Sequence, residues 1–213
     1  MAEMDFGPAG STSGAARWSL PEGATRNYVR FAAIGDRASR HRWARTGAGW
    51  PRVLASLLAE VHDISWCDAS TAAATAYDVR RVQLRTAVAH RPHLVALDVG
   101  VGSLGRRDWD VTEIRDHLTH CARVLSQKGA VLLTAGVGPR ARRHGFRAEQ
   151  LDAVYGELAR RFGTVHLDHA SSPAALADQF ADALGVRGLV LSRPLHPGSE
   201  AESGGQTLGV DGR

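Results

Sequence analysis

At 213 residues the chain has the length of one domain and can bury a substantial hydrophobic core. Its hydrophobic content of 44% and charged content of 23% are typical of globular proteins, and no apolar run approaches the roughly 20 residues of a membrane-spanning helix. The two cysteines, Cys67 and Cys121, are too few and too far apart for a disulfide framework or a metal cluster, so we expect ordinary thiols.

The net charge of +4 comes almost entirely from arginine, since Lys128 is the only lysine. The basic residues are spread along the chain with few aromatic residues among them, which argues against a nucleic-acid-binding surface. We expect the densest run, Arg140–Arg147, to be a mobile, solvated surface loop. The N-terminal residues lack a basic region followed by an apolar one, so we expect a cytoplasmic protein without a membrane anchor.

In chain order, residues 1–27 are poor in large apolar side chains and predict a disordered arm. The apolar and β-branched run from Tyr28 to Ile34 then predicts a buried strand, which ends abruptly at Gly35-Asp36. From Trp50 to Val61 the apolar residues recur at helical spacing, and Pro51 suits the first turn of that helix.

Short apolar runs continue to alternate with amphipathic segments along the rest of the chain. Asp110 is a candidate N-cap with Glu113 at capping-box spacing, and Gly129 closes the helix that follows them. Further strands are predicted at 63–67, 94–99, 130–135 and 164–168, further helices at 77–89, 111–126, 149–162 and 173–184, and a last extended piece at 188–191.

This alternation predicts a flavodoxin-like three-layer α/β/α fold around a five-stranded parallel sheet. The expected domain spans residues 28–197, and the Gly- and Ser-rich residues 198–213 predict a disordered tail. In open parallel sheets, ligands bind outside the carboxyl ends of the strands. We therefore expect the site next to the loop that follows Asp36.

Several short motifs occur in a set order along residues 28–197. They are Ile34-Gly35-Asp36, Gly47-Ala48-Gly49-Trp50, Arg91-Pro92-His93-Leu94-Val95, Gly129-Ala130-Val131-Leu132 and Leu195-His196-Pro197. In this order and spacing the chain resembles the SGNH/GDSL hydrolases, above all their actinobacterial branch. The resemblance implies a serine esterase or lipase fold, in which a serine attacks an ester carbonyl and a histidine and an aspartate activate the serine.

The positions that carry this chemistry in the family are substituted here. Arg37 stands at the nucleophile position, and a guanidinium stays protonated and is not nucleophilic. Ala72-Ala73 replaces the glycine that donates a backbone N–H to the oxyanion, and Gly100–Ser103 lacks the asparagine donor. Arg193 stands at the aspartate position, so that of the characteristic side chains only His196 remains.

The sequence therefore predicts a family member that has lost ester hydrolysis and uses no cofactor or metal. The expected pocket contains Asp36, Arg37, Ala73 and Gly102, and it binds a carboxylate, a phosphate or an acyl ester, or else a partner protein. Arg37 can hold an acid group bidentately. In a competing interpretation, Arg37 pairs with Asp36 or Asp168 and fills the pocket itself.

Two other functions are compatible with parts of the sequence. One is an active esterase with a shifted triad of Ser103 or Ser39, His196 and Asp168. The other is dinucleotide binding, because Gly100–Gly105 matches Gly-x-Gly-x-x-Gly after a strand. Here, however, a polar segment separates the glycines from the next helix, whereas a dinucleotide site needs the helix N-terminus directly at the pyrophosphate. We therefore expect no nucleotide cofactor.

Overall fold

A computed structural model describes residues 26–36, 49–168, 170 and 172–186. The predicted arm up to residue 25, the extended piece at 188–191 and the tail at 198–213 lie outside the described residues. The strands are β1 (Tyr28–Gly35), β2 (Asp63–Asp68), β3 (Leu94–Asp98), β4 (Val131–Ala135) and β5 (Val165–Leu167).

All strand pairs are parallel, and the order across the sheet is β2-β1-β3-β4-β5. This is the flavodoxin-like order, in which the chain changes direction across the sheet between β1 and β3. The helices are α2 (Trp50–Val61), α3 (Ala76–Asp78), α4 (Leu84–His90), α5 (Val111–Gln127), α6 (Pro139–Arg142), α7 (Phe146–Phe162) and α8 (Pro173–Val186).

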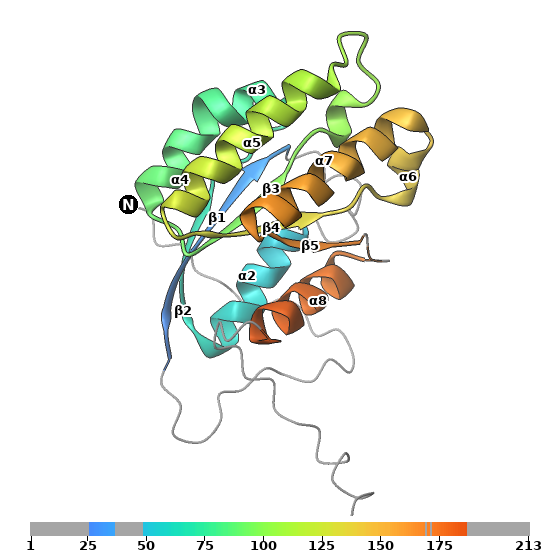
Figure 1. The fold of residues 1–213 in the computed structure, drawn as a ribbon. Helices are drawn as coiled ribbons and strands as arrows, with labels where there is room; N and C mark the ends of the chain where they lie inside the picture. The colour runs from blue at the N-terminus through green and yellow to red at the C-terminus, as the bar shows by residue number, and fades with distance from the viewer. Residues whose placement is uncertain (1–25, 37–48, 169, 171, 187–213) are drawn as a thin grey trace, which may run out of the picture.

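The helices form two layers around the sheet, with α2 and α8 on one face and α3, α4, α5 and α7 on the other (Figure 1). Alternate residues of β1 point to opposite faces, as the pleat requires. Phe31 and Ala33 pack with α2 and α8, where Trp50 stacks on Phe180 at 4.4 Å between ring centroids, whereas Ala32 and Ile34 pack with the other layer. The predicted three-layer fold is confirmed.

Most predicted elements lie within a few residues of their expected positions, but two predictions need correction. The run Arg140–Arg147 is not a loop throughout, because α6 covers its start and α7 already begins at Phe146. The helix predicted at 77–89 is interrupted by η1 (Val79–Gln83), a π-helical segment between α3 and α4. A π turn adds one residue per turn, so it changes which side chains face the sheet.

Tyr155 of α7 links the helix layer of α3, α4, α5 and α7 to the end of β3. Its hydroxyl donates to the carbonyl oxygen of Val99 at 2.5 Å and accepts from the Val99 backbone N–H at 2.9 Å. Complete burial raises the pKa of Tyr155, so the phenol stays protonated and keeps its donor. This pair of bonds fixes the start of the loop that follows β3.

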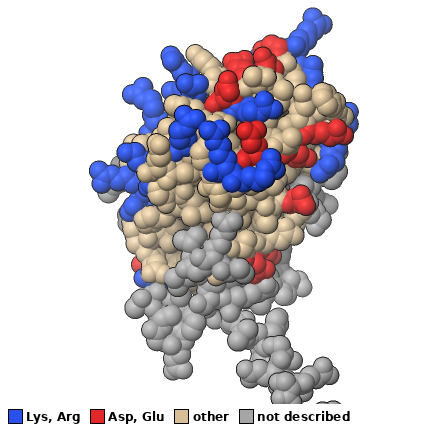
Figure 2. All heavy atoms as spheres, in the orientation of Figure 1, with Lys and Arg blue, Asp and Glu red and all other residues tan. Residues whose placement is uncertain are grey.

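In the described residues, no helix is both long and apolar enough to cross a membrane. Figure 2 shows basic side chains mainly over the upper part of the visible face, with acidic side chains between them. Among the ion pairs of the described residues, Arg115 lies 3.3 Å from Glu157 and Arg106 lies 2.8 Å from Asp108.

Candidate functional site

The candidate site lies at the carboxyl ends of β1, β2 and β3, where the chain leaves β1 through Gly35 and Asp36. Gly35 has φ +133°, and a Cβ there would lie 1.9 Å from the carbonyl oxygen of Asp98. Only glycine fits this position, since both the conformation and the close backbone contact exclude a side chain. The Asp36 N–H then donates to the Asp98 carbonyl at 2.8 Å, which fixes the direction in which the chain continues.

Gln83, from the π-helical segment η1, holds this turn from the second layer. Its Oε1 accepts the Gly35 N–H at 2.6 Å, and its Nε2 donates to the Gly35 carbonyl at 3.1 Å and to Thr71 Oγ1 at 3.0 Å. The side chain is buried, so these bonds are made away from water. Gln83 therefore connects the end of β1 to the loop after β2, a role that the sequence analysis did not predict.

Three of the four predicted ligand-binding residues meet around the Asp36 carboxylate. Asp36 is only 5% exposed, and its Oδ1 accepts the backbone N–H of Ala73 at 2.8 Å. A Cβ on Gly102 would lie 2.4 Å from Asp36 Oδ2, so the carboxylate packs directly on that glycine. The fourth residue, Arg37, lies outside the described residues.

Beside Asp36 is a small crevice, with a cavity volume of about 30 Å³, between the strand ends and the start of α2. Its lining includes the carboxylates of Asp36, Asp68 and Asp98 and the guanidinium of Arg52. Asp98 Oδ2 accepts the indole N–H of Trp50 at 3.3 Å, and Asp68 Oδ1 accepts from the hydroxyl of Ser70. The described lining thus contains three carboxylates and one guanidinium.

No family model and no curated protein sequence matches the chain. Solved structures do match. TesA is 25% identical with a TM-score of 0.54, covering 64% of this chain and 76% of its own. The psychrotrophic esterase EstA from Pseudoalteromonas sp. is 16% identical with a TM-score of 0.54, and the match covers 74% of this chain and 97% of EstA. A protein of the G-D-S-L family from Desulfitobacterium hafniense is 17% identical with a TM-score of 0.53, and the match covers 66% of this chain and 77% of that protein.

The chain has an SGNH/GDSL hydrolase-like fold. Its crevice therefore lies where the strand ends of this fold meet, next to Gly35 and Asp36. The residue that follows this Gly-Asp pair is Arg37.

Within the SGNH/GDSL-like fold, the two described residues of the predicted shifted triad, Ser103 and Asp168, lie in different places. Ser103 ends η2 (Val101–Ser103) after β3, is 7% exposed, and lines a separate cleft beside α3 and α5. Asp168 is exposed and follows β5, which β4 separates from β3. Strands two apart in a sheet are about 10 Å apart. Ser39 and His196 lie outside the described residues.

Within the described residues, none of the hydrogen bonds of a serine hydroxyl goes to a histidine. Thr134 Oγ1 does lie 3.0 Å from Nδ1 of His166, but Thr134 is fully buried in β4. His166 also stacks on Tyr155, with ring centroids 6.0 Å apart, so this pair supports packing between β5 and α7. A nucleophile must reach its substrate, so Thr134 does not qualify.

The two thiols and the glycine triplet are further candidates for a functional site. Burial raises the pKa of Cys121 to about 12 and also raises that of Cys67, so neither sulfur is an activated nucleophile. After Gly100 the chain forms η2 and a further loop, and the long helix α5 starts only at Val111. The glycines thus do not lead into a helix N-terminus. The described residues contain no group of three side chains suited to hold a metal ion.

Proposed function

We propose that this protein is a non-hydrolytic member of the SGNH/GDSL-like fold that binds a small acyl or acidic ligand in the crevice beside Asp36. The uncharged acyl part suits the described lining. An acid group would be held by Arg37, which follows Asp36 in the chain and can form two parallel hydrogen bonds to a carboxylate or phosphate.

The observation that carries the proposal is the position of Asp36. Its N–H continues the hydrogen bonding between β1 and β3, which aligns Gly35 and Asp36 with the strand-end pair that precedes the nucleophile in this fold. The next residue is an arginine, and its guanidinium cannot attack a carbonyl carbon at any accessible pH. This alignment supports the loss of the nucleophile.

The electrostatics around Asp36 support the same proposal. An oxyanion needs N–H donors about 2.7–3.1 Å from the developing charge. The N–H of Ala73 already donates to the Asp36 carboxylate, which also covers Gly102. An oxyanion beside Asp36 would therefore lack the Ala73 donor.

An active esterase built from Ser103 or Ser39, His196 and Asp168 remains the alternative. The neighbour EstA is an esterase, and its structure was determined with monoethylphosphonate as inhibitor. Against this alternative stand the exposed position of Asp168 and the separate cleft that Ser103 lines.

The test of this function is to measure binding and turnover in one sample. We expect butyrate, or a butyryl thioester, at ten times its Kd to stabilise the protein by about 1.4 kcal/mol, which raises Tm by roughly 3–6 °C. The thioester should be recovered intact, with no thiol released above the protein-free rate. In the variant Arg37→Gln the shift with butyrate should be lost, while Arg85→Gln controls for a general loss of positive charge, because Arg85 is exposed on α4 and does not line the crevice.

Each other outcome has a definite meaning. Catalytic release of thiol would contradict the proposal and favour the shifted triad. The absence of any Tm shift with carboxylates, phosphates and thioesters would contradict a small ligand and leave a partner protein as the function of the crevice.

A further inference from the structure

Two segments that pack against each other in one helix layer contain no acidic residue. One is Val79–His90, which forms η1 and α4, and the other is His117–Lys128, the second part of α5 with its C-cap. η1 contacts α5, so the two segments share one face of the molecule. Their positively charged residues are Arg80, Arg81, Arg85, Arg123 and Lys128. These five charges exceed the net charge of +4 of the whole chain, so the positive charge of the protein is concentrated on this face.

Three basic side chains on this face lie close together, and we call Arg80, His120 and Arg123 the η1–α5 cluster. His117, His120 and Arg123 follow one another at three-residue spacing, which places them on one side of α5. Nη1 of Arg80 reaches this side from η1, 3.1 Å from Nδ1 of His117. Burial lowers the pKa of His120, the charges of both arginines lower it further, and His117 adds to this effect when it is protonated. No carboxylate offsets these effects at His120.

His117 positions Arg80 but does not neutralise it. The guanidinium of Arg80 donates to Nδ1 of His117, so the ring hydrogen is on Nε2. This Nε2 lies 3.2 Å from Oε1 of Glu113, one helical turn earlier, and donates to it. Glu113 thus accepts from the imidazole rather than from Arg80, and the guanidinium keeps its charge beside α5.

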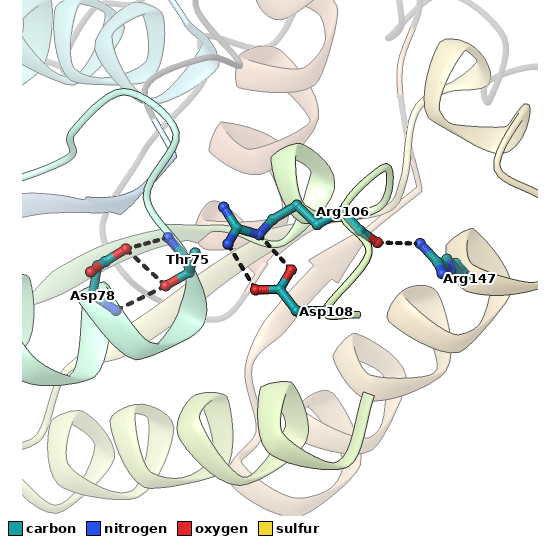
Figure 3. Close-up of polar contacts among 5 residues, drawn as sticks. All are labelled: Thr75, Asp78, Arg106, Asp108 and Arg147. Atoms are coloured by element: carbon teal, nitrogen blue, oxygen red, sulfur yellow. Dashed lines mark hydrogen bonds and ion pairs between the residues drawn. The ribbon is translucent and has the colours of Figure 1, made fainter. Parts of the chain in front are cut away.

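The acidic residue just before Arg80 is also engaged elsewhere. Oδ2 of Asp78 accepts the backbone N–H of Thr75 at 2.9 Å and the Thr75 hydroxyl at 2.8 Å (Figure 3). The cation whose charge acts on Asp78 is Arg106, which donates to both oxygens of Asp108 at 2.9 and 2.8 Å (Figure 3). In the described part of the chain, no ion pair joins the η1–α5 cluster to a carboxylate. The positive charge of the cluster therefore has no counter-charge in the protein.

This arrangement favours a doubly charged anion. Like charges held close together repel one another, and a bound dianion replaces that repulsion by attraction. Arg80 and His120 are partly buried, so solvent and salt screen their charges less than those of fully exposed side chains. Guanidinium groups match the oxygens of a phosphate with two parallel hydrogen bonds, and an imidazole adds a further donor. A phosphate monoester supplies both the charge and three acceptor oxygens.

We propose that the η1–α5 cluster binds the phosphate group of a small organic phosphate. The guanidiniums of Arg80 and Arg123 hold the phosphate oxygens, and His120 donates one more hydrogen bond to them. None of these residues lines the crevice beside Asp36. This site is separate from the crevice of the proposed function, so either can fail without the other.

The test compares three probes that share a benzene ring and differ in charge. Phenyl phosphate, phenyl sulfate and phenol carry two, one and no negative charges at slightly alkaline pH, and each is titrated into the full-length protein by calorimetry. We expect phenyl phosphate to bind most tightly, phenyl sulfate more weakly and phenol not at all. Arg123→Gln should weaken the binding of phenyl phosphate about tenfold, the effect of one hydrogen bond between charged groups. Arg80→Gln should weaken it to a similar extent.

The matched control is Arg160→Gln, which removes the same charge from an exposed position on α7, outside both acid-free segments. This variant should change the Kd for phenyl phosphate less than about twofold. Arg123 is itself exposed, so its replacement should leave the fold intact, and an unchanged Tm establishes this.

The pKa of His120 gives a second measurement, which a purely structural role of the cluster would not change. Inorganic sulfate stays doubly charged throughout a histidine titration, so NMR can follow His120 with and without it. A bound dianion favours the imidazolium, so sulfate should raise the pKa of His120 by about one unit and bind more tightly as the pH falls through that pKa. The proposal is overturned if phenyl phosphate fails to bind at about 10 mM, if phenol binds as tightly, if Arg123→Gln and Arg160→Gln have the same effect, or if sulfate leaves the pKa of His120 unchanged.

Discussion

Replacing Gly35 by alanine should destabilise the protein by at least about 4 kcal/mol, enough to leave little soluble protein. The new Cβ would lie 1.9 Å from the carbonyl oxygen and 2.5 Å from the carbonyl carbon of Asp98. Both atoms belong to the backbone of a central strand, so they cannot move aside without breaking the pairing of β1 with β3. The φ of +133° adds further strain for any residue with a Cβ.

Urea unfolding of Gly35→Ala, or its soluble yield where it cannot be purified, measures the effect. The control is Gly129→Ala, because Gly129 also has a positive φ, of +80°, but no atom lies within 4 Å of its Cβ position. That variant should lose only about 1 kcal/mol, the conformational cost alone. Equal losses in the two variants would show that the close contact with Asp98 is not a constraint.

The change Gln83→Leu should cost about 3 kcal/mol of stability, the second-largest effect that we expect. Leucine fills a similar volume, so the loss comes from hydrogen bonds rather than from a cavity. The N–H of Gly35 loses its side-chain acceptor, and Thr71 Oγ1 loses a donor. A buried donor without a partner bears its full desolvation cost.

Urea unfolding midpoints again provide the measurement, with Gln150→Leu as the matched control. Gln150 accepts one hydrogen bond, from the indole of Trp109 at 3.2 Å, and is only partly buried. Water can replace that bond, so the control should lose less than about 1 kcal/mol. If Gln83→Leu is as stable as the wild type, Gln83 does not hold the turn at Gly35.

The sequence was sufficient to predict the order and type of the main elements, because apolar residues recur at a clear spacing in each of them. The run Phe31–Ile34 before Gly35 is apolar because this part of β1 is buried on both faces, and the spacing from Trp50 to Val61 matches the buried face of α2. The start of α7 was missed because the preceding Arg-rich residues resemble a loop in composition. Composition does not show that Arg147 reaches back to the loop after β3.

The candidate site was predictable only in part. Asp36, Ala73 and Gly102 were expected at the same end of the sheet, and they do lie together, because parallel strands end at one edge. Gln83 was missed because a glutamine in a helical segment is indistinguishable by pattern from a solvent-exposed one. The π turn that directs Gln83 inward cannot be recognised from the spacing of the apolar residues. The orientation of Ser103 likewise depends on the backbone of η2.

The most direct test of the central claim, that the crevice lacks a nucleophile, is the intact mass of the protein after incubation with a reactive alkyl phosphonate. Such reagents phosphonylate an activated serine, and EstA was crystallised with monoethylphosphonate as inhibitor. We predict an unchanged mass under conditions that fully modify an active esterase. A gain of one phosphonyl group that is lost in Ser103→Ala or in Ser39→Ala would contradict the account.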